Sequence, residues 1–224
     1  MSPPLLAPQW MRIVASCLGP AGYYRLALDP MLYASPPPAL LKPAALHAKA
    51  PATFGVEFTT TAGTFVVTVH RAWAPRGADR FYNLVRAGFF AGDEFFRVVK
   101  GFVVQFGISG FPQVSKAWQS ANIPDDPVKA SNTVGTITYA DAGPDSRTTQ
   151  VFINLGKNAF LDTQGFAPFG TVTKGMAVVE KLYEGYGEKP TGDQELIYGQ
   201  GNSFLKKNFP KLDGVISARL VASH

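Results

Sequence analysis

The sequence predicts a mainly β fold, an antiparallel sandwich or barrel, and three observations support this. Short runs rich in β-branched and aromatic residues recur from about residue 53 onward. Glycine and proline are frequent enough to separate these runs into short strands, and only two segments space their apolar residues as a helix does. The chain has 224 residues, 46% of them hydrophobic, so it can bury a substantial core. Neither an internal repeat nor the strand–helix alternation of a doubly wound fold is present.

Eight runs are expected to form strands. The first two cover residues 54–60 and 64–70, and Ala62-Gly63 between them predicts a hairpin. The others are expected at 94–99, 102–106, 134–139, 150–154, 168–172 and 214–221. Each is short, and turn-forming residues separate most of them from the next, which is typical of an antiparallel arrangement.

Two helices are expected between these strands. The segment from Pro75 to Gly88 carries Ala78, Phe81 and Leu84 at helical spacing, so it predicts one amphipathic helix. A second is expected from about Met176 to Tyr183. Two acidic segments, Asp93-Glu94 and Pro124–Pro127, are expected to be solvated turns.

The first fifty residues differ in composition from the rest. They contain many prolines, including three in succession at 36–38, and this density forbids a long helix. Asp29 is their only acid, which is a feature of import peptides, but Lys42-Pro43 interrupts the apolar run that a secretory signal needs. We expect residues 1–50 to be a disordered or loosely docked tail, or a targeting segment, and residues 51–224 to be the domain. A misjudged start of the sequence is the remaining alternative for residues 1–50. The expected compartment is the cytoplasm, or an organelle or the exterior if the tail is a targeting segment.

Charge and ligand-forming residues exclude several classes of function. The formal net charge is +5, but the basic residues form no dense run, so no nucleic-acid partner is expected. Cys17 is the only cysteine, and the three histidines show no ligand spacing, so we expect no disulfide, no metal site and no cofactor. No apolar stretch approaches the ~20 residues of a membrane helix.

An arginine and a glutamine stand among apolar residues on two consecutive expected strands. Alternation places Arg97 on one face of its strand with Phe95, and Gln105 on one face of the next with Val103. A buried guanidinium without a partner is costly, so Arg97 must find an acceptor or face a ligand. Spacing alone leaves open an outward-facing or carboxylate-paired Arg97 and a ligand-facing one.

The residues around this pair resemble the cyclophilin signature. In that family Phe-x-Arg is followed by Gly-Phe and, three residues after that Phe, by Gln. The matching residues are Phe95, Arg97, Gly101, Phe102 and Gln105. Residues 139–153 are similar to the family's Ala-Gly-Pro loop ending in Gln-x-Phe, and residues 160–170 to its pocket-closing loop. The segment 77–84 matches its first helix, so the resemblance covers about residues 53–183 in the family's order.

The resemblance implies a closed eight-stranded antiparallel β-barrel capped by two α-helices, with an external groove for a proline-containing peptide. It implies a peptidyl-prolyl cis/trans isomerase that assists protein folding, with Arg97 as the catalytic residue. The substrate-binding residues it implies are Phe102, Val103, Gln105, Ala140, Asp141, Gln150, Phe152, Phe160, Leu161 and Phe166. Among these, Gln105 and Gln150 would hold Arg97 and the substrate backbone, while Ala140 and Asp141 would offer main-chain hydrogen bonds.

Some positions depart from the family pattern. Phe166 stands where the family often has His, and Asp141 where it often has Asn. Phe160 stands where many members have a Trp that supports cyclosporin binding. We therefore expect catalysis to be kept and cyclosporin binding to be weakened. None of the departures removes Arg97.

The chemistry of isomerisation agrees with these residues. Twisting a peptide bond loses its resonance at a barrier of ~18–20 kcal/mol, and no bond is broken, so no nucleophile or metal is required. One rival hypothesis is a module that only holds a proline-containing partner, with incidental turnover. Another is a β-barrel carrier, which would need a cavity of several hundred Å³ inside the barrel. We favour the enzyme, as a monomer that acts on proline-containing polypeptides.

Overall fold

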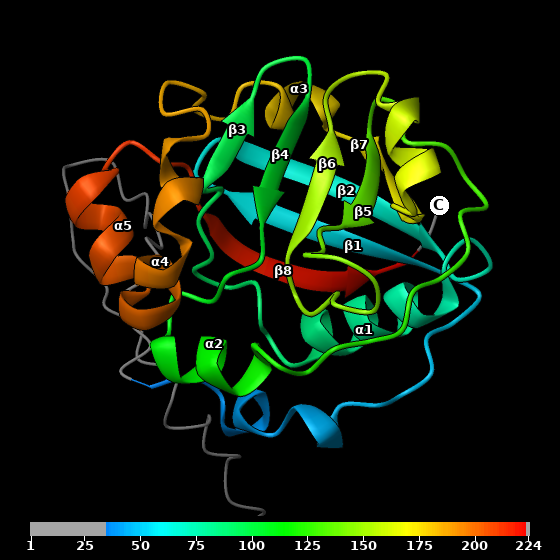
Figure 1. Ribbon diagram of the computed structural model, residues 1–224, viewed down its shortest axis with the longest axis horizontal. Coiled ribbons are helices and arrows are strands. Elements are labelled where there is room, and N and C mark those ends of the chain that lie inside the picture. Colours follow the sequence, from blue (N-terminus) through cyan, green and yellow to red (C-terminus); the bar gives the residue numbers. More distant parts are fainter. Residues whose placement is uncertain (1–34, 223–224) are drawn as a thin grey trace, which may run out of the picture. The chain divides into compact units, whose positions relative to one another are not determined.

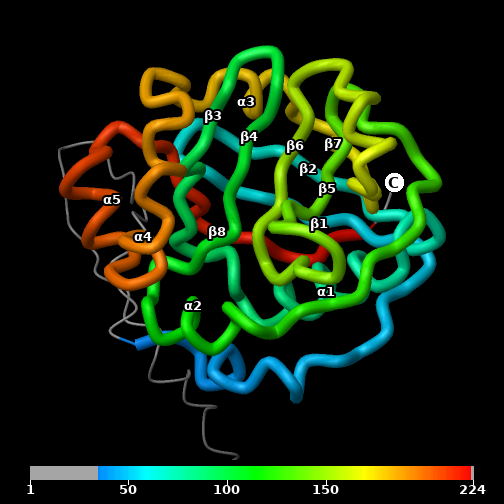
Figure 2. The backbone as a smooth tube through the Cα atoms, in the orientation of Figure 1, coloured from blue at the N-terminus to red at the C-terminus, as the bar shows by residue number. Residues whose placement is uncertain are grey.

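The computed structural model describes residues 35–222, and its centre is one eight-stranded antiparallel sheet. The strand order is β3-β4-β6-β5-β7-β2-β1-β8. The strands are β1 (Thr53–Thr60), β2 (Gly63–His70), β3 (Arg97–Val99), β4 (Val103–Phe106), β5 (Thr136–Tyr139), β6 (Val151–Asn154), β7 (Pro168–Lys174) and β8 (Val215–Val221). All eight predicted strands are confirmed, with ends that shift by a few residues. Figure 2 shows β8, near the end of the chain, beside β1, the first strand.

The sheet is curled, and one short bridge connects its two edge strands. Glu94 and Gly214, just before β3 and β8, form an isolated antiparallel bridge. No ladder between β3 and β8 extends this bridge within the described residues, so the hydrogen bonding differs from that of a fully closed barrel. Asp93 and Glu94 lie at this bridge, and Asp93 is completely buried. The expectation of a solvated turn here is wrong, because the approach of the two edges removes Asp93 from water and leaves Glu94 only partly exposed.

Five α-helices occur among the described residues, where the sequence predicts two. They are α1 (Pro75–Arg86), α2 (Pro112–Trp118), α3 (Met176–Val179), α4 (Gln194–Gln200) and α5 (Asn202–Asn208). The 3₁₀ turns are η2 (Pro38–Leu41), η3 (Pro43–Ala45), η4 (Ala159–Gln164) and η5 (Lys189–Asp193). α1 is confirmed, the second predicted helix is only α3, and α2, α4 and α5 are additional. Figure 1 shows α1 and α3 at opposite ends of the curled sheet and α4 and α5 on the side of β3.

The interior of the curled sheet is filled by aromatic rings. Phe58 on β1 stacks on Phe65 of β2 at 4.9 Å between ring centroids, and it meets Phe90 and Phe106 edge-on at 5.8 and 5.7 Å. All four rings are fully buried. Rings at these separations leave no space for a ligand between them. The interior is therefore a packed core, and a carrier function gains no support.

A distant carboxylate caps the first turn of α1. The buried Asp126 accepts hydrogen bonds from the backbone N–H groups of Arg76 and Gly77, at 3.1 and 2.9 Å. It also accepts from the guanidinium of Arg147 at 3.3 Å. The first N–H groups of a helix lack intrahelical partners, so an anion is stabilised there. The prediction of a solvated turn at Pro124–Pro127 is wrong for Asp126 for this reason.

Residues 36–50 belong to the same compact unit as the sheet, which starts at Pro36. Leu40 is buried, and its carbonyl accepts a hydrogen bond from the indole N–H of Trp118 on α2 at 2.8 Å. The backbone N–H of Ala50 donates to Asp79 on α1 at 2.8 Å. The compact unit thus starts earlier than the expected domain boundary at residue 51. Residues 1–34 of the expected tail lie outside the described residues.

Candidate active site

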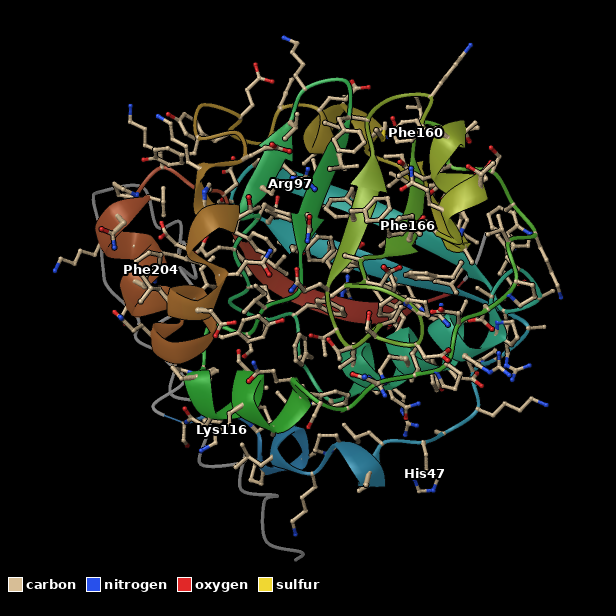
Figure 3. All side chains as sticks on the ribbon, viewed as in Figure 1. His47, Arg97, Lys116, Phe160, Phe166 and Phe204 are labelled. Carbon is tan, nitrogen blue, oxygen red and sulfur yellow. The ribbon has the colours of Figure 1, made fainter. Side chains whose placement is uncertain are left out.

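A groove of about 340 Å³ lies beside β3, β4 and β6. Its lining residues are Arg97, Phe102, Val103, Gln105, Ala140, Asp141, Phe152, Leu161, Phe166, Glu188, Thr191 and Gln194. The structure therefore brings every predicted site residue to this groove except Gln150 and Phe160. Figure 3 shows Arg97 and Phe166 on the face of the strands turned toward the viewer, with Phe160 nearer the edge.

The hairpin of β3 and β4 places the first groove residues. Val99 pairs with Val103, so the loop between them has Gly101 at its centre, with a φ of 69°. A left-handed residue at this point of a three-residue hairpin loop favours glycine. Arg97 and Gln105 are direct cross-strand partners in this hairpin. Side chains alternate along β4, so Val103 and Gln105 line the groove while the next residues enter the core.

Arg97 is held by three groups of different chemistry. Its Nη1 donates to the amide oxygen of Gln105 at 3.1 Å, and its Nη2 forms an ion pair with Glu188. The guanidinium carbon lies 5.3 Å from the ring centroid of Phe102, at cation–π distance. The side chain is 23% exposed. Arg97 is therefore paired with a carboxylate, and it also lines the groove.

Gln150 lies behind Gln105 and fixes the orientation of its amide. The Nε2 of Gln105 donates to the Oε1 of Gln150 at 2.8 Å. The Nε2 of Gln150 in turn donates to the hydroxyl of Tyr198 on α4 at 2.8 Å and to Gln194 at 3.2 Å. This chain of hydrogen bonds leaves the Oε1 of Gln105 as the acceptor for Arg97. Gln150 thus supports the site from outside the groove.

One part of the groove is an apolar pocket. Val103, Phe152 and Leu161 form a buried cluster, against which Phe102 and Phe166 pack. The rings of Phe152 and Phe166 meet edge-on at 5.8 Å. Such a pocket matches a compact apolar group such as a pyrrolidine ring.

Phe160 lies outside this pocket, on the rim. Its side chain is 53% exposed, and its ring stacks on that of Phe102 at 6.2 Å between centroids. It belongs to η4, whose residues also supply Leu161 to the pocket. Phe160 therefore extends the apolar surface beyond the groove without lining it.

A buried asparagine network supports the pocket from below. Asn132 donates to the carboxylate of Asp162 at 2.7 Å and to the carbonyl of Phe166 at 2.8 Å. Asn158 donates to the carbonyl of Phe102 at 2.9 Å and to Asn154 at 2.7 Å. Burial opposes ionisation of Asp162, but hydrogen bonds from Ser131 and Asn132 outweigh it and lower the pKa of Asp162. Isolated asparagines carry no periodic sequence signal, so the sequence does not point to this network.

The C-terminal region supplies three groove residues that the sequence does not identify. Glu188, Thr191 and Gln194 come from η5 and its flanks. Glu188 is 91 residues from Arg97 in the sequence, and the family motifs end before it. Only the tertiary fold brings this region to β3.

Three charged side chains line the groove, namely those of Arg97, Asp141 and Glu188. Asp141 accepts a hydrogen bond from the backbone N–H of Gly143 at 3.2 Å, and burial raises its pKa above the ordinary value. No group of three or more His, Cys, Asp or Glu in residues 35–222 is arranged to hold a metal ion. Within the same residues, no helix has both the length and the apolar character needed to span a membrane.

Comparison with known proteins identifies relatives of this chain. The model of the family described as cyclophilin type peptidyl-prolyl cis-trans isomerase matches residues 55–198. Peptidyl-prolyl cis-trans isomerase A of Dickeya dadantii is 40% identical over 136 residues, which cover 57% of this chain and 70% of that protein. Peptidyl-prolyl cis-trans isomerase B of Escherichia coli is 34% identical over 181 residues, which cover 75% of this chain and 99% of that protein.

Solved structures agree on the fold. The crystal structure of a cyclophilin type isomerase from Cryptosporidium parvum matches with a TM-score of 0.58 at 17% identity, covering 77% of this chain and 99% of that one. A second structure of that protein, in the presence of the dipeptide Ala-Pro, matches with a TM-score of 0.57 at 17% identity, covering 75% of this chain and 99% of that one. The curled eight-stranded sheet is therefore a cyclophilin-like fold. From the family match and these relatives, the chain belongs to the cyclophilin-type peptidyl-prolyl cis-trans isomerase family, and its activity is that of a peptidylprolyl isomerase.

Proposed function

We propose that the groove isomerises peptide bonds preceding proline, with Arg97 as the catalytic residue. The single observation that carries this proposal is the presence of an orientated guanidinium and a buried apolar pocket in one groove. The pocket of Val103, Phe152, Leu161 and Phe166 holds the proline ring. Arg97 then lies beside the peptide bond that rotates.

The guanidinium stabilises the twisted bond more than the planar one. In the planar amide the proline nitrogen shares its lone pair with the carbonyl, and in the twisted state it regains that pair and accepts a hydrogen bond. A donor that binds the twisted state better lowers the barrier. Arginine suits this step because it stays protonated and presents its donors from a rigid plane. Gln105 holds that plane in position through Nη1.

The partner of the groove is a proline-containing polypeptide. The Ala-Pro dipeptide accompanying the Cryptosporidium parvum relative supports this proposal. Ala140 and Asp141, just after β5, are proposed to offer main-chain hydrogen bonds to the peptide. For Ala140 the group is the carbonyl, because its N–H already donates to the carbonyl of Gln150 at 3.0 Å. Cyclosporin is proposed to bind weakly, because Phe160 on the rim is smaller than indole and has no N–H donor.

Substituting Arg97 tests the proposal. Arg97→Ala removes the donor, so the isomerisation rate of a proline peptide should fall by roughly 10²–10³, or ~3–4 kcal/mol of barrier. Arg97→Lys keeps the charge but loses the planar fork, and it should also be badly impaired. Both rates are measured beside a thermal melt and a peptide-binding titration.

Arg219→Ala is the matched control, because Arg219 also pairs with a glutamate, Glu57, but lies on β8 outside the groove. This control should keep the parental rate. If the Arg97 variants are folded and keep parental rates as well, Arg97 is not catalytic. If they unfold, the role of Arg97 is structural.

A further inference from the structure

We infer that Glu188 is a specificity-determining residue that makes the groove prefer proline peptides with a basic side chain beside the proline. This inference rests on the proposed function, because it assigns a substrate class to the same groove. It starts from the position of Glu188 at the N-terminal end of η5, outside the segments that carry the family motifs.

The backbone of Glu188 is fixed while its side chain is free to change partners. Its carbonyl accepts hydrogen bonds from the backbone N–H of Thr191 at 2.9 Å and from the Thr191 hydroxyl at 2.6 Å. The side chain is 60% exposed, and Arg97 is its only ion-pair partner within the described residues. A carboxylate on a rigid turn at the groove wall can therefore turn toward a bound peptide without rearrangement of the chain.

Arg97 does not depend on Glu188 alone for its position. When the carboxylate turns to a substrate, Gln105 still accepts from Nη1 and the ring of Phe102 still lies against the guanidinium. The exchange therefore replaces one exposed ion pair by another, while the catalytic geometry stays in place.

The charges of the groove favour a cation. Asp141 faces the same space, and no ion pair within the described residues joins it to a basic side chain. Two carboxylates thus face one guanidinium, and the lining carries an excess of one negative charge. A lysine or arginine beside the proline is attracted by this excess, while an aspartate or glutamate is repelled.

The size of the effect follows from the exposure of these groups. Exposed ion pairs contribute little each, so each carboxylate should change the rate for a charged peptide by about 1.4-fold to 5-fold. The excess negative charge raises kcat/KM for a lysine peptide and lowers it for a glutamate peptide, so the ratio of the two values contains both effects. The ratio of kcat/KM for a lysine peptide to that for a glutamate peptide should be about 2-fold or more at low salt.

The experiment compares three proline peptides that differ only in having Ala, Lys or Glu beside the proline, first on one side and then on the other. Glu188→Gln keeps an oxygen acceptor for Arg97 and removes only the charge, so the lysine-to-glutamate ratio should fall by about 2-fold to 5-fold. Glu188→Lys should reverse the preference. High salt should reduce the ratio of the parent protein, because exposed charges are screened.

Glu180→Gln is the matched control, since Glu180 is exposed at the end of α3 and does not line the groove. It should leave the ratio unchanged. A parental ratio of about one on both sides of the proline, or equal ratios for Glu188→Gln and Glu180→Gln, overturns the inference. A different outcome, in which the parent does not isomerise the Ala peptide, contradicts the proposed function itself.

Discussion

Arg97 and Arg147 show how two arginines of one chain can differ in purpose. Arg147 is buried, and Asp126, which is also buried, compensates its charge. Removing Arg147 would leave that carboxylate buried without its cation, which is strongly destabilising. The carboxylate partner of Arg97 is exposed, so its removal strands no buried charge. The exposure of the carboxylate partner thus distinguishes the two arginines: Arg147, with a buried partner, stabilises the fold, whereas Arg97, with an exposed partner, can take part in binding at the groove.

Glu94 should make the stability of the protein depend on pH near neutrality. Burial is the main cause that raises the pKa of Glu94, to about 7, and the nearby Asp213 raises it further while Lys206 opposes it. The unfolded chain has an ordinary glutamate pKa, so between about pH 4.3 and 7 the folded state binds more protons. The free energy of unfolding should therefore fall as the pH rises through this window, by on the order of 3 kcal/mol.

Glu94→Gln removes this titration, so its stability should fall less than that of the parent between pH 5 and pH 8. Urea unfolding of both proteins at the two pH values measures the difference. Parallel changes in the two proteins would show that Glu94 is not the group responsible.

The sequence predicts the elements that have a recognisable local residue pattern, but it does not predict the short helices whose formation depends on packing against distant parts of the chain. The strands are recognisable because alternating β-branched and aromatic residues are bounded by turn residues. α2, α4 and α5 have seven residues each, too few to show a helical period. Their buried residues, such as Trp118 and Ile197, face partners that only the tertiary fold provides.

The same distinction applies to the site. Arg97, Phe102 and Gln105 lie within a few residues of one another, and Phe152 belongs to a second compact motif, so the family pattern identifies them. The acceptor of the Arg97 Nη2 is Glu188, which lies in the sequence after the last family motif. A contact between distant segments depends on the path of the chain, which a single sequence does not state.

The η4 element should determine the affinity for cyclosporin. Phe160, on the exposed side of this turn, stacks on Phe102, and the resemblance assigns a cyclosporin-supporting Trp to this position. Phe160→Trp adds ring area and an indole N–H at the rim, so we expect about a tenfold gain in affinity, or ~1.4 kcal/mol. The isomerase rate should change little, since Phe160 does not line the pocket.

A binding titration of the parent and the variant, with the rate measured beside it, checks both expectations. The adjacent pocket residue provides the contrast, because Leu161→Ala should lower activity. Equal affinities for the parent and Phe160→Trp would show that this turn does not control the drug site.

At the scale of the whole molecule, the compact unit includes a segment whose composition is that of a tail. Prolines at 36–38 and 43 prevent long helices, yet they are compatible with the short turns η2 and η3. Leu40 on η2 is only 1% exposed, whereas its neighbour Leu41 is 44% exposed. The segment is therefore attached by specific burial, and composition alone does not reveal that.

Leu40→Ala should lower the free energy of unfolding by about 2–4 kcal/mol, because it removes a buried side chain and leaves a cavity. Leu41→Ala is the matched control and should change stability by less than about 0.5 kcal/mol. Thermal and urea unfolding of the two variants measure this directly. Equal stabilities would mean that residues 36–50 are not part of the folding unit and that the domain starts near residue 51.

The pairing of β1 with β8 has a consequence for how the protein is made. Residues 55–60 pair with residues 215–221, so the two strands are separated by most of the chain. During synthesis, β1 can pair with β2 at once, but its other edge has no partner until the last strand leaves the ribosome. Contacts of this separation give a high contact order, which slows folding. This isomerase, which itself catalyses a slow folding step, therefore completes its own sheet late, when β8 pairs with the free edge of β1.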